Sequence, residues 1–139
     1  MLVQIFEVQT PEEAAALVRL GVDHIGVLVG DGSFPRELSI AQTKAIFAAV
    51  PVGHTSVALS LSPTLEEVAR VVEETKPDIV QVQAEIEDFS VTMTRALKLR
   101  FPEVSMMRAI PVIDEASIET AASRQPQMSL PRISVPSRW

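Results

Sequence analysis

Residues 30–38 are the polar segment of this chain best suited to bind a ligand. They read Gly-Asp-Gly-Ser-Phe-Pro-Arg-Glu-Leu and place an acid, Asp31, and a base, Arg36, on one loop. The apolar run 24–29 precedes them, and its β-branched, non-alternating composition is typical of a strand buried on both faces. In parallel α/β folds, ligands bind on the loops that leave the carboxyl ends of the strands. The sequence therefore predicts a ligand site at Asp31 and Arg36.

Two roles are open for Arg36. Its guanidinium binds an anionic ligand, or it is a solvated loop side chain that pairs with Asp31 or Glu37. The Gly30-Asp31-Gly32 stretch is too short to indicate a phosphate-binding loop. Anion binding and local pairing therefore remain alternatives.

Other polar side chains lie in or beside apolar, strand-like runs. Gln4, Gln81 and Gln83 either line the cavity of a barrel or bond to one another. Arg108 lies in the apolar run 105–112, where a buried charge needs a partner. Glu7 and Glu85 are the candidates for that partner.

Composition limits the function classes. The 139 residues predict one domain, and 47% apolar content with a mean hydropathy of +0.24 predicts a packed core. A net charge of −6 and a pI near 4.9 argue against nucleic acid and anionic membranes as partners. The chain has no cysteine, which excludes thiolate chemistry, and its two histidines lack metal-ligand spacing. No apolar run approaches the ~20 residues of a membrane span, so we expect a cytoplasmic protein.

The elements that must position these residues alternate regularly. Helix starts are marked by capping residues, such as Thr10 with Glu13 and Ser39 with Gln42. Each expected helix follows an apolar, strand-like run. The expected strands cover residues 2–6, 24–29, 56–61, 79–82 and 105–112, and the expected helices begin near residues 11, 40, 65, 90 and 115.

Five successive β-α units of this kind predict an α/β fold with a parallel sheet and right-handed crossovers. Either an open, doubly wound sheet or part of a (β/α)8 barrel satisfies the pattern. Residues 123–139 depart from it, because they hold three prolines, three arginines and no acid, whereas all 18 acids precede them. We expect a domain over residues 1–122, followed by a tail over residues 123–139 that is disordered or not native to the domain.

Five segments, in order, resemble the phosphoribosylanthranilate isomerases. Residues 3–14 (VQIFEVQTPEEA) are similar to their opening V-K-I-C-G-I-T-x-P-E-D-A, and residues 21–29 (GVDHIGVLV) are similar to G-A-D-A-I-G-F-V-F. Residues 34–39 (FPRELS) match S-P-R-Y-V-S. Residues 78–85 (DIVQVQAE) match D-x-V-Q-L-H-G-D, and residues 108–112 (RAIPV) match K-A-I-x-V.

The resemblance implies the first five units of an incomplete TIM (β/α)8 barrel. It also implies an Amadori rearrangement of a phosphoribosyl compound in tryptophan biosynthesis, with a general base and a general acid and with no cofactor or metal. Arg36 then binds the carboxylate of a small phosphosugar ligand, and Asp31, Gln4, Gln81, Gln83 and Arg108 line the substrate site.

The chain departs from the family at the catalytic positions. Phe6 stands at the family's catalytic cysteine, and Glu7 stands at the glycine that follows it. Gln4 replaces a lysine and Gln83 replaces a histidine. The pattern ends before the sixth strand that carries the family's acid and before the phosphate loops. Glu7 is then the candidate substitute base, provided that burial raises its pKa.

Three hypotheses follow. The chain is a divergent isomerase-like protein that is inactive by itself, because base, acid and phosphate loops are replaced or missing. Alternatively, it is a binding module that kept an anion site and lost the chemistry. In the third hypothesis, open sheet edges pair between copies in a homo-oligomer.

Overall fold

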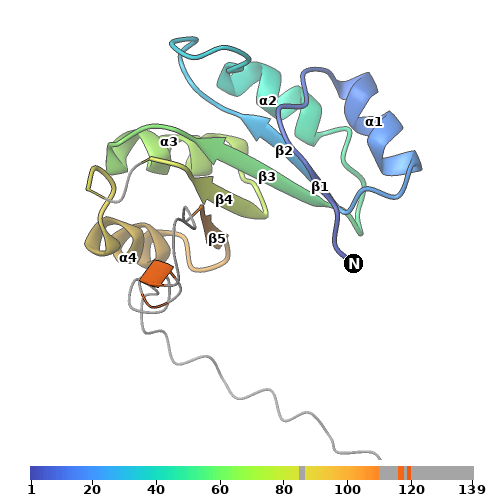
Figure 1. Ribbon diagram of the computed structural model, residues 1–139. Coiled ribbons are helices and arrows are strands. Elements are labelled where there is room, and N and C mark those ends of the chain that lie inside the picture. The colour runs from blue at the N-terminus through green and yellow to red at the C-terminus, as the bar shows by residue number, and fades with distance from the viewer. Residues whose placement is uncertain (85–86, 110–115, 118, 120–139) are drawn as a thin grey trace, which may run out of the picture.

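The computed structural model describes residues 1–84, 87–109, 116, 117 and 119 (Figure 1). The predicted last helix, the end of the run 105–112, Glu85 and the tail 123–139 lie wholly or largely outside these residues. The strands are β1 (Gln4–Ile5), β2 (His24–Leu28), β3 (Thr55–Ser60), β4 (Ile79–Val82) and β5 (Ser105–Arg108). The helices are α1 (Pro11–Arg19), α2 (Ile40–Phe47), α3 (Leu65–Thr75) and α4 (Val91–Arg100).

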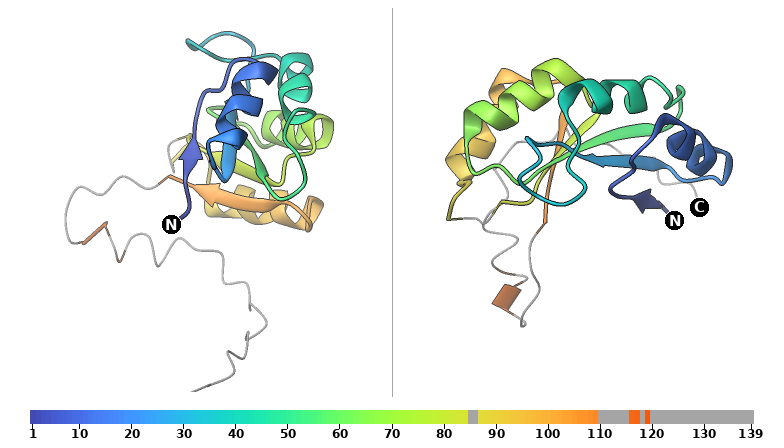
Figure 2. Two further views of the ribbon diagram at one scale, coloured as in Figure 1. Left: turned by 90° about the vertical axis from the view of Figure 1, so that its right-hand side faces the viewer. Right: turned by 90° about the horizontal axis from the view of Figure 1, so that it is seen from above.

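The order of the strands distinguishes the two predicted architectures. The five described strands are all parallel and lie in the order β1-β2-β3-β4-β5, with no reversal. A doubly wound sheet reverses its order and carries helices on both faces. Here α1, α2, α3 and α4 all lie on the convex side of one curved sheet (Figure 2). The described residues therefore form successive units of the TIM-barrel type, as predicted.

Capping residues set where the helices begin. Ser39 and Gln42 form the predicted capping box at the start of α2. Thr10 accepts a hydrogen bond from the backbone N–H of Glu13 at the start of α1. The Glu13 carboxylate reaches the N–H of Gln9, 2.8 Å away, and so fixes the loop between β1 and α1 as well as the helix.

The convex face of the sheet carries the main core. Alternate residues of the strands point toward the helices and are fully buried there. They pack against the apolar stripes of α1, α2 and α3, which have the spacing expected of amphipathic helices. The buried residues of this face include Ile25, Val27, Ala58, Val80 and Val82.

The concave face carries a smaller apolar cluster made of Leu28, Val57 and Leu59. Gly26 lies beside Val57 on this face and leaves room for the end of β1. A β-carbon at Gly26 would lie 3.0 Å from the carbonyl oxygen of Ile5 and 3.1 Å from Leu59 Cδ1. The missing side chain therefore allows the end of β1 to lie close against β2.

Replacing Gly26 with alanine is expected to destabilise the fold. The added methyl group meets a backbone atom that cannot rotate away, so β1 must shift. Overpacking of this kind costs about 1–3 kcal/mol of unfolding free energy. Urea denaturation followed by circular dichroism measures the change, and an unchanged midpoint would show that β1 is free to move.

None of the helices described here combines the length and the apolar character that crossing a membrane requires.

Candidate functional site

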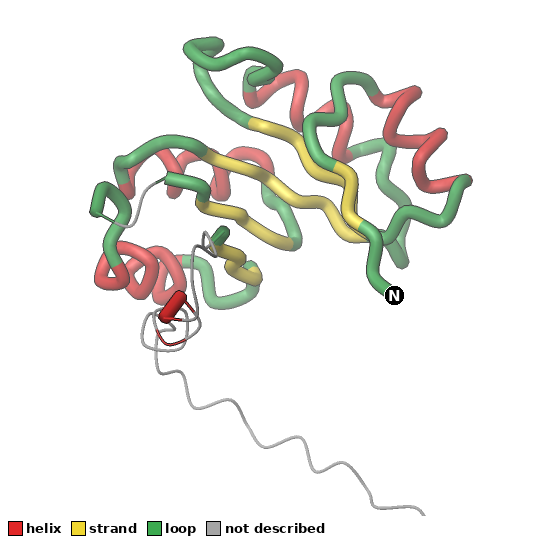
Figure 3. Tube along the Cα trace, in the orientation of Figure 1, coloured by secondary structure: helices red, strands yellow, loops and turns green. Residues whose placement is uncertain are grey.

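The loop between β2 and α2 extends beyond the end of the sheet (Figure 3). Its two ends are joined by main-chain bonds, since Leu38 N–H donates to Leu28 and Gly30 N–H donates to Leu38. Inside the loop, the Glu37 carboxylate accepts hydrogen bonds from the N–H groups of Gly32 and Phe34. The predicted ligand loop is therefore a closed, internally bonded turn.

Asp31 is fixed within this loop by Ser33. One carboxylate oxygen of Asp31 accepts hydrogen bonds from the Ser33 hydroxyl and from the Ser33 N–H, the latter at 2.9 Å. The hydroxyl bond, followed by the N–H bond, holds the pKa of Asp31 below its ordinary value of 3.8. Asp31 is therefore a fixed carboxylate rather than a proton donor near neutral pH.

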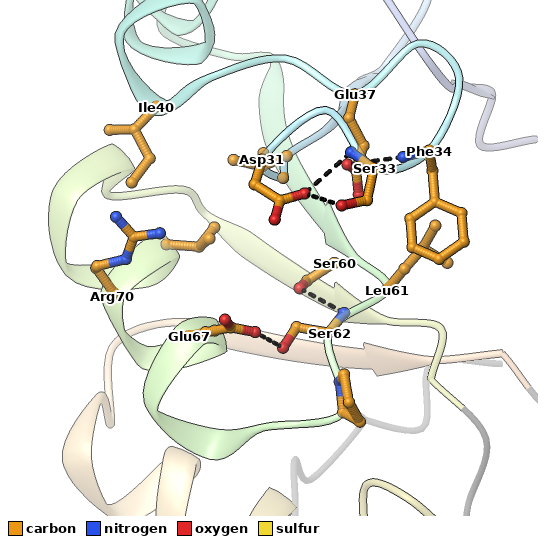
Figure 4. Close-up of a pocket in the computed structure, with 14 residues that line it drawn as sticks. Asp31, Ser33, Phe34, Glu37, Ile40, Ser60, Leu61, Ser62, Glu67 and Arg70 are labelled. Atoms are coloured by element: carbon orange, nitrogen blue, oxygen red, sulfur yellow. Dashed lines mark hydrogen bonds between the residues drawn. The ribbon is translucent and has the colours of Figure 1, made fainter.

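A pocket of about 240 Å³ lies between this loop, the residues that follow β3, and α3 (Figure 4). Asp31 projects from one wall and Arg70 from the opposite wall. Glu67 bonds to the Ser62 hydroxyl along the lower rim. Glu37 also lines the pocket, so its lining includes three acids and one arginine.

Arg36 does not face this pocket. Its Nε lies 2.7 Å from the Glu7 carboxylate, and its Nη2 donates to the Glu7 carbonyl oxygen at 2.8 Å. The guanidinium therefore pairs with Glu7, and not with the predicted alternatives Asp31 and Glu37. This contact joins the loop after β1 to the loop after β2 at the carboxyl edge of the sheet.

Both partners have an unusual backbone. Glu7 has a φ of 56° and Arg36 a φ of 68°, in the left-handed region that favours glycine. The Gln9 side-chain amide clamps the pair, because its nitrogen donates to the carbonyl oxygens of both residues at 3.1 Å. Such conformations persist where surrounding contacts fix them.

Glu7 and Arg36 remain accessible. Their side chains are 45% and 51% exposed, respectively. Glu7 is therefore half-exposed, whereas its expected role as a base assumed a buried carboxylate. An added ligand, by contrast, is able to reach the guanidinium.

The predicted glutamines divide into two groups. On the concave face, the Gln4 amide donates to Gln81, 3.1 Å away, although their strands are not neighbours in the sheet. His24 Nδ1 lies 3.0 Å from the Gln4 oxygen, which extends the chain of contacts to β2. Gln83 is exposed, and its N–H continues the pairing with Ser60.

Arg108 lies on the other side of the sheet. It aligns with Val82, which faces the helices, and its guanidinium donates to the carbonyl oxygen of Ala84 at 3.1 Å. The same group lies 5.9 Å from the ring centre of Phe89. The structure thus places Arg108 away from Arg36 and from the glutamines.

Sequence reasoning missed the contact between Glu7 and Arg36, and also missed Gln9, Glu67 and Arg70. For the contact between Glu7 and Arg36, the useful signal is the glycine that the isomerases carry at the position of Glu7, because glycine indicates a left-handed backbone. Over the described residues, no group of three histidine, aspartate or glutamate side chains is arranged to hold a metal ion.

Replacing Ser33 with alanine is expected to raise the pKa of Asp31 back toward 3.8, because the hydroxyl bond that stabilises the carboxylate is lost. A ¹³C NMR titration of the Asp31 carboxyl group measures the midpoint. Since the folded pKa lies below the ordinary value, the stabilising effect is present above pH 3.8 and disappears as the pH falls through the folded pKa. Ser62→Ala, which leaves Asp31 untouched, is the control, and equal midpoints in both variants would contradict the assignment.

No protein-family model matches the chain. The curated proteins and solved structures that resemble it are phosphoribosylanthranilate isomerases. N-(5′-phosphoribosyl)anthranilate isomerase of Neisseria meningitidis is 31% identical over 119 residues, which cover 86% of this chain and 53% of that protein. The chain thus spans about half the length of the curated relatives it matches.

Solved structures agree with the fold. Phosphoribosyl anthranilate isomerase from Thermotoga maritima superposes with a TM-score of 0.76 at 21% identity, over 88% of this chain and 57% of that one. A second structure of such an isomerase also gives 0.76 at 21% identity and covers 88% and 60% of the two chains. It was solved with reduced 1-(o-carboxyphenylamino)-1-deoxyribulose 5-phosphate.

Proposed function

Because this chain is a divergent homologue of the phosphoribosylanthranilate isomerases, we propose that it binds a carboxylate-bearing phosphosugar at Arg36 and does not isomerise it by itself. The observation that carries the proposal is the Arg36 guanidinium, held half-exposed at the carboxyl edge of β1 and β2. Arginine presents a planar fork of N–H donors that matches a carboxylate.

Phe6 supports the absence of turnover. It directly follows β1, at the position where the isomerases carry their base, and its phenyl ring accepts no proton. An Amadori rearrangement needs a base for the proton on C2 and an acid at the ring oxygen. The nearby Glu7 carboxylate is already bonded to Arg36, which leaves the described carboxyl edge of β1 without a free base.

Gln4 and Gln81 fit a binding role. They lie on the concave face, where Gln4 donates to Gln81 and the Gln4 oxygen contacts His24. Amide groups arranged in this way donate and accept hydrogen bonds to a sugar without transferring protons. We therefore assign them to binding rather than to chemistry.

The expected result of Arg36→Ala is a loss of affinity of about tenfold or more, the effect of removing a charge-assisted hydrogen bond. The probe is the reduced ligand found in the related isomerase structure, and titration calorimetry measures its dissociation constant. Arg70→Ala is the matched control, because Arg70 lines the separate pocket. When N-(5′-phosphoribosyl)anthranilate is added to the wild-type chain, the fluorescence of the solution should not change, because no product forms. Turnover by the pure chain, or weakening by Arg70→Ala alone, would contradict the proposal.

A second candidate, self-association, is favoured by the sheet edges. Among the described strands, β1 and β5 each have one neighbour, and Ile5 and Met107 on these strands are 37% and 36% exposed. Unpaired edges with exposed apolar residues are templates for pairing with another chain. The occupant that we propose is a second copy of this chain.

Light scattering across a hundredfold dilution series tests this candidate. A mass that rises with concentration is expected for the wild type, and Met107→Lys should reduce it, since an edge lysine opposes strand pairing. Leu99→Lys is the control, because Leu99 is an exposed apolar residue of a helix, α4, and not of an edge strand. A constant monomer mass would refute self-association.

A further inference from the structure

We propose that the Glu7 side chain is a built-in counter-ion that keeps the Arg36 site in a self-occupied, low-affinity state. The inference rests on the proposed carboxylate site and adds the residue that sets its affinity. Removing the Glu7 charge should therefore strengthen the binding of an external carboxylate.

The geometry of the guanidinium supports this role. Glu7 occupies one edge of the group, with its carboxylate on Nε at 2.7 Å and its carbonyl oxygen on Nη2 at 2.8 Å. A guanidinium carries five N–H donors, and each edge is able to donate two parallel hydrogen bonds. An incoming carboxylate must displace Glu7 from this edge, or bind to the remaining edge against the negative charge of Glu7.

The carboxylate is not needed to hold the two loops together. Gln9 bonds to the backbone carbonyl oxygens of Glu7 and Arg36, and Arg36 Nη2 also bonds to the Glu7 carbonyl oxygen. All three bonds survive a change of the Glu7 side chain. Since exposed ion pairs add little to stability, a structural role alone does not explain the carboxylate.

The backbone of Glu7 points to the same conclusion. A φ of 56° is easily adopted by glycine and is costly for glutamate. The glutamate at this position has the costly conformation, and both its carboxylate and its carbonyl oxygen contact Arg36. Glycine at this position would keep the carbonyl contact and leave the edge of Arg36 half open.

The test compares Glu7→Gln and Glu7→Gly with the wild type, using benzoate as the probe. Both variants should bind benzoate roughly three- to fivefold more tightly at low salt, the range of a released surface ion pair, with a smaller gain at high salt. Glu12→Gln is the charge-matched control, because Glu12 is exposed in the first turn of α1 and should leave the affinity unchanged. The ¹⁵N resonance of Arg36 Nε provides a second readout, and it should shift in both Glu7 variants and not in Glu12→Gln.

The outcomes separate this inference from the proposed function. Arg36-dependent binding that is unchanged or weaker in both Glu7 variants would overturn the inference and leave the binding site standing. An Arg36 Nε resonance that does not respond to either variant would also overturn it, because the ion pair would then be absent in solution. Lack of benzoate binding by the wild type and by every variant would refute both proposals together.

Discussion

The close approach of the end of β1 to Gly26 of β2 is the constraint on which the rest of the site depends. Gly26 lies under the end of β1, with no side chain to hold the strand away. This approach places Gln4 within hydrogen-bonding distance of Gln81, across a sheet in which their strands are separated by two others. It also fixes where Phe6 and Glu7 emerge. The missing side chain at Gly26 therefore leaves room for the end of β1 and for the residues that follow it.

The fold was largely predictable from the sequence, because each element carries its own local signal. Apolar runs and capping residues such as Ser39 locate strands and helices independently of one another. The choice between a doubly wound sheet and a barrel-type sheet depends on strand order, which local patterns do not encode. The resemblance to the isomerases supplied that information, and the observed order agrees with it.

The site was less predictable, because it depends on pairings between segments far apart in the chain. The sequence identifies Arg36 as a candidate and favours its sequence neighbours Asp31 and Glu37 as partners. Backbone N–H groups and Ser33 occupy those two carboxylates instead. The true partner, Glu7, is 29 residues away. It has a left-handed backbone, which a glutamate in the sequence does not predict. Arg108 shows the converse, since a residue in a predicted strand lies on either face until the register is known.

The main-chain bonds that close residues 30–37 have a consequence for how this fold changes over evolution. Gly30 N–H donates to Leu38, and Leu38 N–H donates to Leu28 at the end of β2, so the loop begins and ends at a fixed pair of points. The entropy of closing such a loop grows slowly with length, by about 0.6 kcal/mol for each doubling. Insertions and deletions between these points therefore leave the sheet undisturbed. The sequence between Gly30 and Leu38 is therefore able to change in length and composition, and so to form a different binding surface, at little cost to the free energy of folding.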